Sequence, residues 1–293
     1  MAELALSSVV QLLISGLSVG AIYSAMALGL TTIYGILRLL HIAHAGVYVA
    51  GAYFGFMLYI LTGNIVLSFG ASALSSMALG YAIERALYLP LIKKPKHILL
   101  AISIAMFMLI EELVANVAGH YPKGFYTNIP NVIINLGEVV LTTYQILVVG
   151  LAYIASLIVW GIYSKTKIGM ASRALIQDME IAECMGVNSK RVIDFNFLVG
   201  SALAGISGIL VGIYYSSIWP YMGDPVAYKA LVVIVLGGFG SIPGVILGGL
   251  ILGVTESYLV ALLGRLLPKD AFAFIVLILL LVFRPRGLFG KIE

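Results

Sequence analysis

The sequence predicts an all-α protein, a polytopic bundle of about eight or nine transmembrane helices, some of them broken. Hydrophobic residues make up 61% of the 293 positions and charged residues only 10%. An ordinary soluble domain is about 45–50% apolar and about 25% charged. The apolar residues also gather into blocks of about 20 residues, the length of a membrane-crossing helix. A soluble enzyme is excluded, because so few charged side chains cannot cover a globule of this size.

The apolar blocks follow one another along the whole chain. The first covers residues 7–37, longer than one straight span needs, so it tilts, extends beyond the bilayer or breaks. Single-span blocks follow at about residues 42–61, 65–83, 98–118, 143–163 and 195–217. The last block, residues 227–283, is interrupted at 237–238, 241–243 and 264–270 and holds two or three spans. Residues 1–293 are therefore expected to form a single transmembrane domain.

The basic residues predict the orientation. Twelve of the 17 lysines and arginines lie in three segments: Arg85, Lys93, Lys94, Lys96; Lys165, Lys167, Arg173, Lys190, Arg191; Arg284, Arg286, Lys291. Cytoplasmic loops carry such an excess, so these segments and the C-terminus are expected inside. The loop 119–141 has only Lys123 and is expected outside. The side of the N-terminus depends on whether the first block crosses once or breaks.

Several functions are excluded by missing residues. The single cysteine, Cys184, forms neither an intrachain disulfide nor a metal site alone. His41 and His44 are the only close histidine pair, and no acidic residue or cysteine lies near them in the sequence, so a metal site is not expected. Basic and aromatic residues are not interleaved as in nucleic-acid binders. The chain lacks the Gly-x-x-x-x-Gly-Lys-Ser/Thr loop that holds nucleotide phosphates. We therefore expect no catalysis and no cofactor, and energy must come from another chain or an ion gradient.

The segment 164–194 is the longest charged stretch. Residues 173–185 are free of glycine and proline and predict one short amphipathic helix, stopped by Gly186; Asn188 and its neighbours then cap a helix beginning near Lys190. Such a helix either lies on the lipid headgroups or inserts into a groove of a soluble partner. The acidic residues Asp178, Glu180 and Glu183 disfavour an anionic membrane surface. Both interpretations remain open from the residues alone.

Glycines predict broken helices at both ends of the chain. Gly35, Gly46, Gly51 and Gly55 are expected to interrupt the early spans, and Gly237, Gly238, Gly240, Pro243 and Gly244 a late one. Paired breaks in two halves indicate a transport site, because unwound backbone is tolerated only inside protein or a water-filled cavity. The alternative is that these glycines only permit close helix packing.

Few ionisable residues fall inside the spans. His44 either lines a path or is a neutral histidine that donates to a backbone carbonyl. Glu111 and Glu112 are adjacent on one helix, so at most one of them faces the bundle interior. Glu256 also cannot face lipid without a partner.

The pattern Glu180-x-Ala182-x-x-x-Gly186 resembles the cytoplasmic signature of permease subunits of ABC importers. Residues 16–38, 43–53, 237–249 and 283–290 are similar to branched-chain amino-acid permeases, best to the shorter H-type subunit of the Liv system. The chain departs from that family at residues 41–45 and 169–171. The resemblance implies the type II ABC importer permease fold in the plasma (inner) membrane of a prokaryote.

The resemblance also implies partners and site residues. A second, distinct M-type permease, two ATPase subunits that use the ATP, and an extracytoplasmic solute-binding protein are expected. The cytoplasmic coupling loop is 164–194, with ATPase-coupling residues Arg173, Asp178, Glu180, Ala182, Met185 and Gly186. The translocation path is expected at His41, His44, Gly46, Gly237, Gly238, Gly240 and Pro243. The alternatives are a urea or short-amide ABC permease and an ion-coupled secondary transporter.

Overall fold

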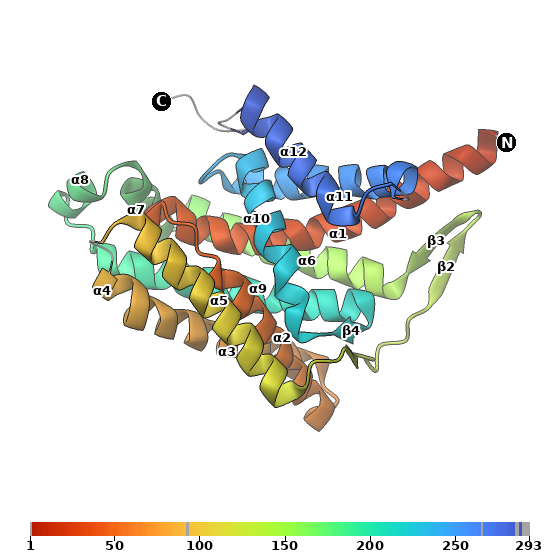
Figure 1. The fold of residues 1–293 in the computed structure, drawn as a ribbon, viewed down its shortest axis with the longest axis horizontal. Coiled ribbons are helices and arrows are strands. Elements are labelled where there is room, and N and C mark those ends of the chain that lie inside the picture. The colour runs from red at the N-terminus through yellow and green to blue at the C-terminus, as the bar shows by residue number, and fades with distance from the viewer. Residues whose placement is uncertain (1, 92–93, 265, 285–286, 289–293) are drawn as a thin grey trace.

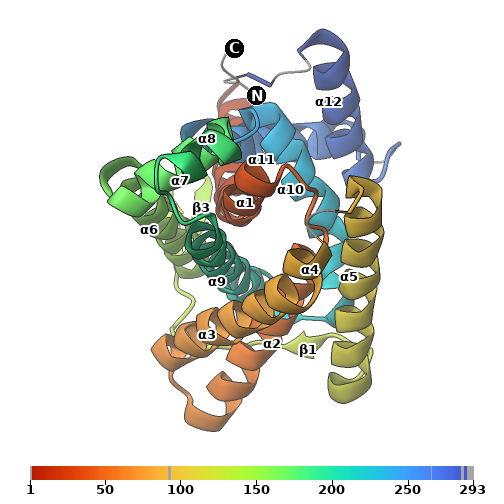
Figure 2. The ribbon, with the colours of Figure 1, turned by 90° about the vertical axis from the view of Figure 1, so that its left-hand side faces the viewer.

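One long helix, α1, lies at the centre of the molecule. The computed structural model describes residues 2–91, 94–264, 266–284 and 287–288. The helix α1 is unbroken over 36 residues, about 54 Å at 1.5 Å per residue. Figure 2 shows it surrounded by other helices, and it contacts α6, α9, α10 and α11. The bounds are α1 (Ala2–Leu37), α6 (Thr143–Lys165), α9 (Ser189–Tyr215), α10 (Asp224–Gly237) and α11 (Ile242–Leu263).

A second group of helices packs on α9, either directly or through another member of the group. It consists of α2 (Ala43–Thr62), α3 (Ile65–Ile83) and α5 (Lys96–Ala118), and α3 continues through the π-helical turn η1 (Glu84–Tyr88) into α4 (Leu89–Leu91). Among the described residues, seven helices are long and apolar enough to cross a membrane. Two apolar helices, α10 with 14 residues and α12 (Lys269–Phe283) with 15, are shorter. Figure 1 shows α10 running across the long helices rather than along them. The predicted helical membrane bundle is confirmed.

The two ends of the bundle differ. At one end, which we name the hairpin end, β2 (Ile133–Leu136) pairs with β3 (Val139–Thr142), and β1 (Lys123–Gly124) pairs with β4 (Ser217–Ile218). The loop 119–141 therefore contains strands that the sequence did not predict. The other end, the basic end, carries α4, α7 (Lys167–Gln177) and α8 (Met179–Cys184). A 3-10 turn, η2 (Pro220–Gly223), precedes α10. Lys93, Arg286 and Lys291, used to predict the orientation, lie outside the described residues.

The course of α1 relates the N-terminus to these two ends. Gln11 bonds the hairpin in both directions: its Nε2 donates to the Val140 oxygen at 3.0 Å, and its Oε1 accepts from the Val140 N–H at 2.8 Å. At the far end of α1, Arg38 Nη2 donates to the Ile176 oxygen at 3.0 Å. The first apolar block thus makes one continuous pass from the hairpin end to the basic end.

The predicted interruptions of the early spans are wrong. Gly35 lies within α1, and Gly46, Gly51 and Gly55 lie within the continuous helix α2. Three of them, Gly46, Gly51 and Gly55, pack closely against neighbouring helices. A Cβ built on Gly51 would lie 2.0 Å from Ser76 Oγ, and one on Gly55 would lie 2.1 Å from Ile209 Cδ1. The chain does break between α1 and α2, where Arg38 has a φ of 50°.

Backbone contact between α1 and α11 depends on a seam of four glycines. A Cβ on Gly16 would lie 2.6 Å from Val254 Cα, and one on Gly253 would lie 2.5 Å from Gly20 Cα. On the other side of the seam, a Cβ on Gly249 would clash with Ser24. Because lipid tails are as apolar as leucine, such close approach is a main source of helix association in a membrane.

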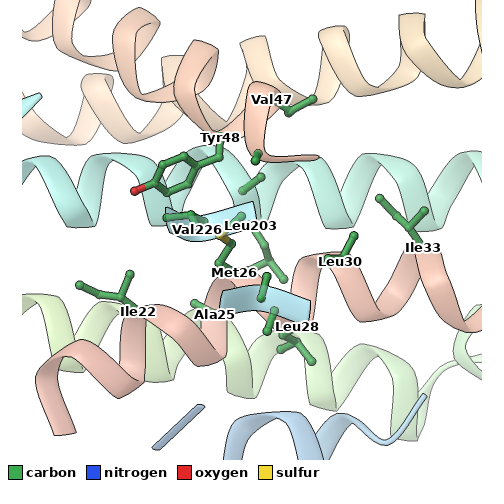
Figure 3. Close-up of a cluster of buried hydrophobic side chains, with 14 of the residues drawn as sticks. Ile22, Ala25, Met26, Leu28, Leu30, Ile33, Val47, Tyr48, Leu203 and Val226 are labelled. Atoms are coloured by element: carbon green, nitrogen blue, oxygen red, sulfur yellow. The ribbon is translucent and has the colours of Figure 1, made fainter. Parts of the chain in front are cut away.

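Side chains of four elements meet in one buried cluster beside this seam. Figure 3 shows Met26 of α1, Tyr48 of α2, Leu203 of α9 and Val226 of α10 within it. The short helix α10 therefore shares the core of the long helices, and its steep crossing is fixed by packing on both sides of the bundle.

A buried ion pair joins α1, α10, α11 and α12. Lys229 Nζ lies 2.7 Å from Glu256 Oε1 and 3.1 Å from Asp270 Oδ1. It also donates to the Tyr23 hydroxyl at 3.0 Å, which in turn donates to Glu256 Oε2 at 2.9 Å. The side chains of Lys229 and Glu256 are 4% and 1% exposed, whereas that of Asp270 is 51% exposed. The expectation that Glu256 needs a partner is confirmed.

Replacing Gly253 by alanine tests the glycine seam. The added methyl group must push α1 and α11 apart, and such overpacking costs about 1–3 kcal/mol. We expect Gly253→Ala to lower the midpoint of thermal unfolding in detergent. The matched control is Gly150→Ala in α6, where a Cβ meets nothing within 4 Å and alanine gains up to about 1 kcal/mol of helix propensity. Equal midpoints for the two variants would contradict the role of the seam.

Removing the charge of Lys229 tests the ion pair. Lys229→Met leaves the Glu256 carboxylate buried without its cation, which costs about 3–5 kcal/mol. The double variant Lys229→Met/Glu256→Met removes both charges and should recover most of that loss. The measurement is unfolding in mixed detergent and dodecyl sulfate, with Lys94→Met, an exposed lysine, as control. If the double variant is less stable than Lys229→Met, the unpaired charge of Glu256 is not the cause of the lost stability.

Candidate functional site

The predicted coupling helix is two helices. Asp178 has an extended backbone, with φ −151° and ψ 118°, and separates α7 from α8. Its Oδ1 accepts a hydrogen bond from the Ile181 N–H at 2.9 Å, so it caps the start of α8. The prediction of one helix over residues 173–185 is therefore wrong. Aspartate binds a backbone N–H better at a helix start than it serves inside a helix.

A Schellman turn ends α8. Gly186 has a φ of 88°, its N–H donates to the Glu183 oxygen at 2.9 Å, and the Val187 N–H donates to the Ala182 oxygen at 3.0 Å. Both bonds are those of the Schellman motif, whose left-handed residue is usually glycine. Asn188 Oδ1 then accepts from the Arg191 N–H at 3.1 Å and caps α9. The predicted stop at Gly186 and the predicted cap at Asn188 are confirmed.

The two faces of α8 differ in exposure. Ala182 is 5% exposed and packs toward the body of the protein, together with Leu175 of α7. Met185 is 82% exposed and Ile181 is 63% exposed, and Glu180 is also exposed. We name Glu180, Ile181 and Met185 the α8 surface. Two large apolar side chains at the tip of a projecting loop are typical of a protein contact site.

Arg173 of α7 and the late chain break line the same cavity. Arg173 also donates through its Nη1 to the Tyr163 carbonyl oxygen of α6. It lines a cleft of about 200 Å³ at the basic end, bounded by α1, α6, α7 and residues 240–243. We name this cavity the Arg173 cleft. It brings together Arg173, predicted for coupling, with Gly240 and Pro243, predicted for the path.

The late break is real, but Pro243 does not cause it. The helix α10 ends at Gly237, and Gly238 and Gly240 have φ values of 89° and 78°. Pro243 lies in the first turn of α11, where its missing N–H costs no helical hydrogen bond. Ser241 Oγ accepts from the Gly244 N–H at 3.2 Å and caps this helix. The turn is therefore built by left-handed glycines and a serine cap.

The other predicted path residues lie elsewhere. His41 and His44, with ring centroids 5.8 Å apart, line a cavity of about 10 Å³ beside α10, room for a single water. His41 Nδ1 bonds the Tyr88 hydroxyl at 2.8 Å, and the buried ring of His44 pairs with the backbone of Met26. Gly46 packs against Ile110 of α5. The predicted path residues thus fall into at least two separate places.

Two further placements concern the acidic residues. Glu111 is 5% exposed, whereas Glu112 is exposed and accepts from the Tyr221 hydroxyl at 3.3 Å. The prediction that at most one of them faces the interior is confirmed.

Lys229 was not predicted from the sequence. Its partner Glu256 lies 27 residues away, so the pair gives no signal at helical spacing. A lysine inside a short apolar block was the available signal.

Comparison with known proteins agrees with this architecture. The family described as "Branched-chain amino acid transport system / permease component" matches residues 12–283. The chain is 34% identical to the high-affinity branched-chain amino acid transport system permease protein BraD of Pseudomonas aeruginosa, over 97% of this chain and 96% of that protein. It is 32% identical to LivH of Escherichia coli K12 over the same shares. A probable LivH of Methanocaldococcus jannaschii is 26% identical, over 90% and 87%. The chain belongs to the permease family of branched-chain amino acid transport systems.

Proposed function

We propose that this chain forms the translocation path of an ATP-driven ABC importer for branched-chain amino acids. The observation that carries this proposal is the α8 surface, where Ile181 and Met185 are exposed on a short helix that is capped at both ends. A projecting apolar contact site is what a permease needs to receive force from a separate motor. The family membership supports the substrate class, since the named relatives transport branched-chain amino acids.

The proposal includes the subunits named by the resemblance. Two ATPase subunits dock on the α8 surface and hydrolyse ATP, a second permease of the M type completes the membrane part, and a solute-binding protein delivers the amino acid from outside. The whole chain 1–293 acts as one permease domain with the coupling loop 164–194. The lack of a phosphate-binding loop in the sequence supports this division of labour.

The basic end is proposed to face the cytoplasm of a prokaryotic cell, with the C-terminus on that side and the plasma (inner) membrane around the helices. The supporting observation is that α4, α7 and α8 share one end of the bundle with most of the basic loop residues. Gln11 of α1 lies at the hairpin end, so the N-terminus belongs to the outer side in this orientation.

Two connections leave the α8 surface toward the membrane helices. One runs through the Schellman turn at Gly186 into α9. The other runs through Asp178 into α7, whose Arg173 bonds α6 and whose Ile176 lies beside Gly240 in the turn between α10 and α11. We propose that ATP binding moves α8 and that this turn, with Gly237, Gly238, Gly240 and Pro243, shifts in response. His41 and His44 then belong to the part of the path beside α10, and Gly46 to the neighbouring contact of α2 with α5.

Replacing Ile181 by aspartate tests the docking role. A charge at the centre of an apolar contact costs about 2 kcal/mol or more, so association with the ATPase subunits should weaken by at least about tenfold. ATP-driven uptake by reconstituted liposomes should fall in parallel. The control is Ile133→Asp, an equally exposed position at the hairpin end. Full uptake driven by an ion gradient in the absence of ATP would contradict the assignment as an ABC importer.

Replacing Gly186 by alanine tests the turn itself. A side chain at a φ of 88° is strained, by roughly 1–2 kcal/mol, and the α8 surface should lose its fixed position. The matched control is Gly137→Ala, with a φ of 70° in the external hairpin, where the strain is similar but no motor docks. We expect loss of ATP-driven uptake for Gly186→Ala alone. Equal loss for both variants shows a general effect on stability rather than on coupling.

Substrate identity is tested separately by competition. In liposomes with the complete importer, uptake of labelled leucine should be displaced by isoleucine and valine. Displacement by urea or acetamide, with no effect of valine, assigns the chain to the short-amide permeases instead.

A further inference from the structure

We infer that Glu84 and Asp194 form a proton-binding site at the basic end, in which two carboxyl groups share one proton. Glu84 lies in the π-helical turn η1 that continues α3, and Asp194 lies in the second turn of α9. The shared proton fastens the end of α3 to the start of α9, where the coupling loop 164–194 ends. The site itself does not depend on the proposed function, whereas its effect on transport rests on that function.

The burial of Glu84 points to a bound proton. The residue is 0% exposed, and neither of its carboxyl oxygens has an N–H or O–H donor among the described residues. A buried carboxylate without a donor or a cation is strongly destabilising, so such a group takes up a proton and becomes neutral. A proton needs no cavity, so the closed packing around Glu84 does not exclude it.

The carboxyl group of Asp194 is the acceptor for that proton. It is in hydrogen-bond contact with the Glu84 side chain, and its Oδ1 is buried without an N–H donor among the described residues. Two carboxyl groups bond to each other only when one of them carries a proton, because an ionised carboxylate has no hydrogen to donate. The pair therefore holds one proton, since two adjacent buried carboxylates do not both ionise.

The neighbouring charges decide which carboxyl group is neutral. Arg85 Nη2 forms an ion pair with Asp194 Oδ2 at 2.6 Å, so the negative charge stays on Asp194. The Arg85 guanidinium also lies over the Tyr81 ring, 4.9 Å from its centroid. Lys190, one turn before Asp194 on α9, is exposed and also acts on Glu84. One arginine in contact with the pair matches one negative charge and one shared proton.

The backbone at Glu84 provides a separate observation. The Leu89 N–H donates to the Glu84 oxygen, which is the spacing of a π-helix, and single π-turns inside helices occur frequently at functional sites. One turn earlier, a Cβ on Gly80 would clash with Ser201 of α9, so α3 and α9 are in close contact up to this turn. The carboxyl pair forms the last part of that contact.

Loss of the shared proton would weaken the contact between α3 and α9. Two negative charges side by side in a buried place repel each other, so alkaline pH at the basic end pushes the end of α3 away from α9. The start of α9 follows directly on the Schellman turn at Gly186 and the cap Asn188, which hold α8. The importer should therefore lose coupling to the ATPase subunits as the pH on that side rises.

The pH dependence of unfolding in mixed detergent and dodecyl sulfate tests the proton site, with Glu84→Gln as the variant. Glutamine is neutral at every pH, and its amide donates to Asp194 as a protonated glutamate does. The folded wild type binds one proton more than the unfolded chain, whose carboxyl is ionised above about pH 5. The unfolding constant of the wild type should rise about tenfold per pH unit relative to that of Glu84→Gln, until the shared proton is lost.

Two further variants complete the comparison. Glu138→Gln, at an exposed glutamate of the hairpin, should follow the wild-type pH profile, because its carboxyl is solvated in both states. Glu84→Met, which is of similar length and does not titrate, replaces Glu84→Gln if the amide prevents folding. The same pH profile for the wild type and the Glu84 variants would overturn the inference.

Transport tests the consequence in liposomes that contain the complete importer. ATP-driven leucine uptake by the wild type should fall by about fivefold or more relative to Glu84→Gln when the pH at the ATPase side is raised from about 7 to about 9. Equal pH profiles of uptake would overturn the effect on coupling. If neither protein takes up leucine with ATP at any pH, the proposed function is wrong, and the unfolding experiment still decides whether the proton is bound.

Discussion

The backbone contact between α1 and α11 is the constraint on which the rest of the structure depends. Gly16 and Gly20 on one helix face Gly249 and Gly253 on the other, so no side chain separates the two main chains. Because α11 is held so close, Ser24 Oγ of α1 donates to the Ile246 oxygen near the start of α11, and Glu256 accepts from Tyr23. The short helices α10 and α12 pack on this pair. Small residues thus position both the buried charges and the cleft.

At the basic end, hydrogen bonds that cap the helix ends fix the positions of α8 and the start of α9. Asp178 and Asn188 satisfy helix N-termini, and Gly186 satisfies a helix C-terminus in a left-handed conformation. The pattern of Glu180, Ala182 and Gly186 then has a physical reading: the glycine turns the chain, the alanine fits a buried contact, and the glutamate stays exposed. A loop fixed in this way can transmit movement because its own hydrogen bonds are already satisfied.

Much of this architecture could be predicted from the sequence, because apolar blocks of span length are a strong local signal. The bounds of α2, α3 and α6 differ from the predicted ones by few residues. Glycine gave a weaker signal: Gly51 packs within a helix, whereas Gly238 ends one, and only neighbouring helices decide between these roles. The ion pair of Lys229 and Glu256, and the cleft that Arg173 and Gly240 both line, bring together distant segments and have no local spacing to reveal them.

The position of Lys229 has a consequence for biogenesis. The helix α10 has 14 residues and carries a lysine, which costs about 2.5–3.5 kcal/mol at the centre of an isolated inserted helix. It is also too short to cross alone. The ribosome makes Tyr23 long before Lys229 and makes Glu256 after it. Stable membrane integration of α10 must therefore wait until α11 has left the insertion machinery, so this part of the chain enters the lipid as a pair.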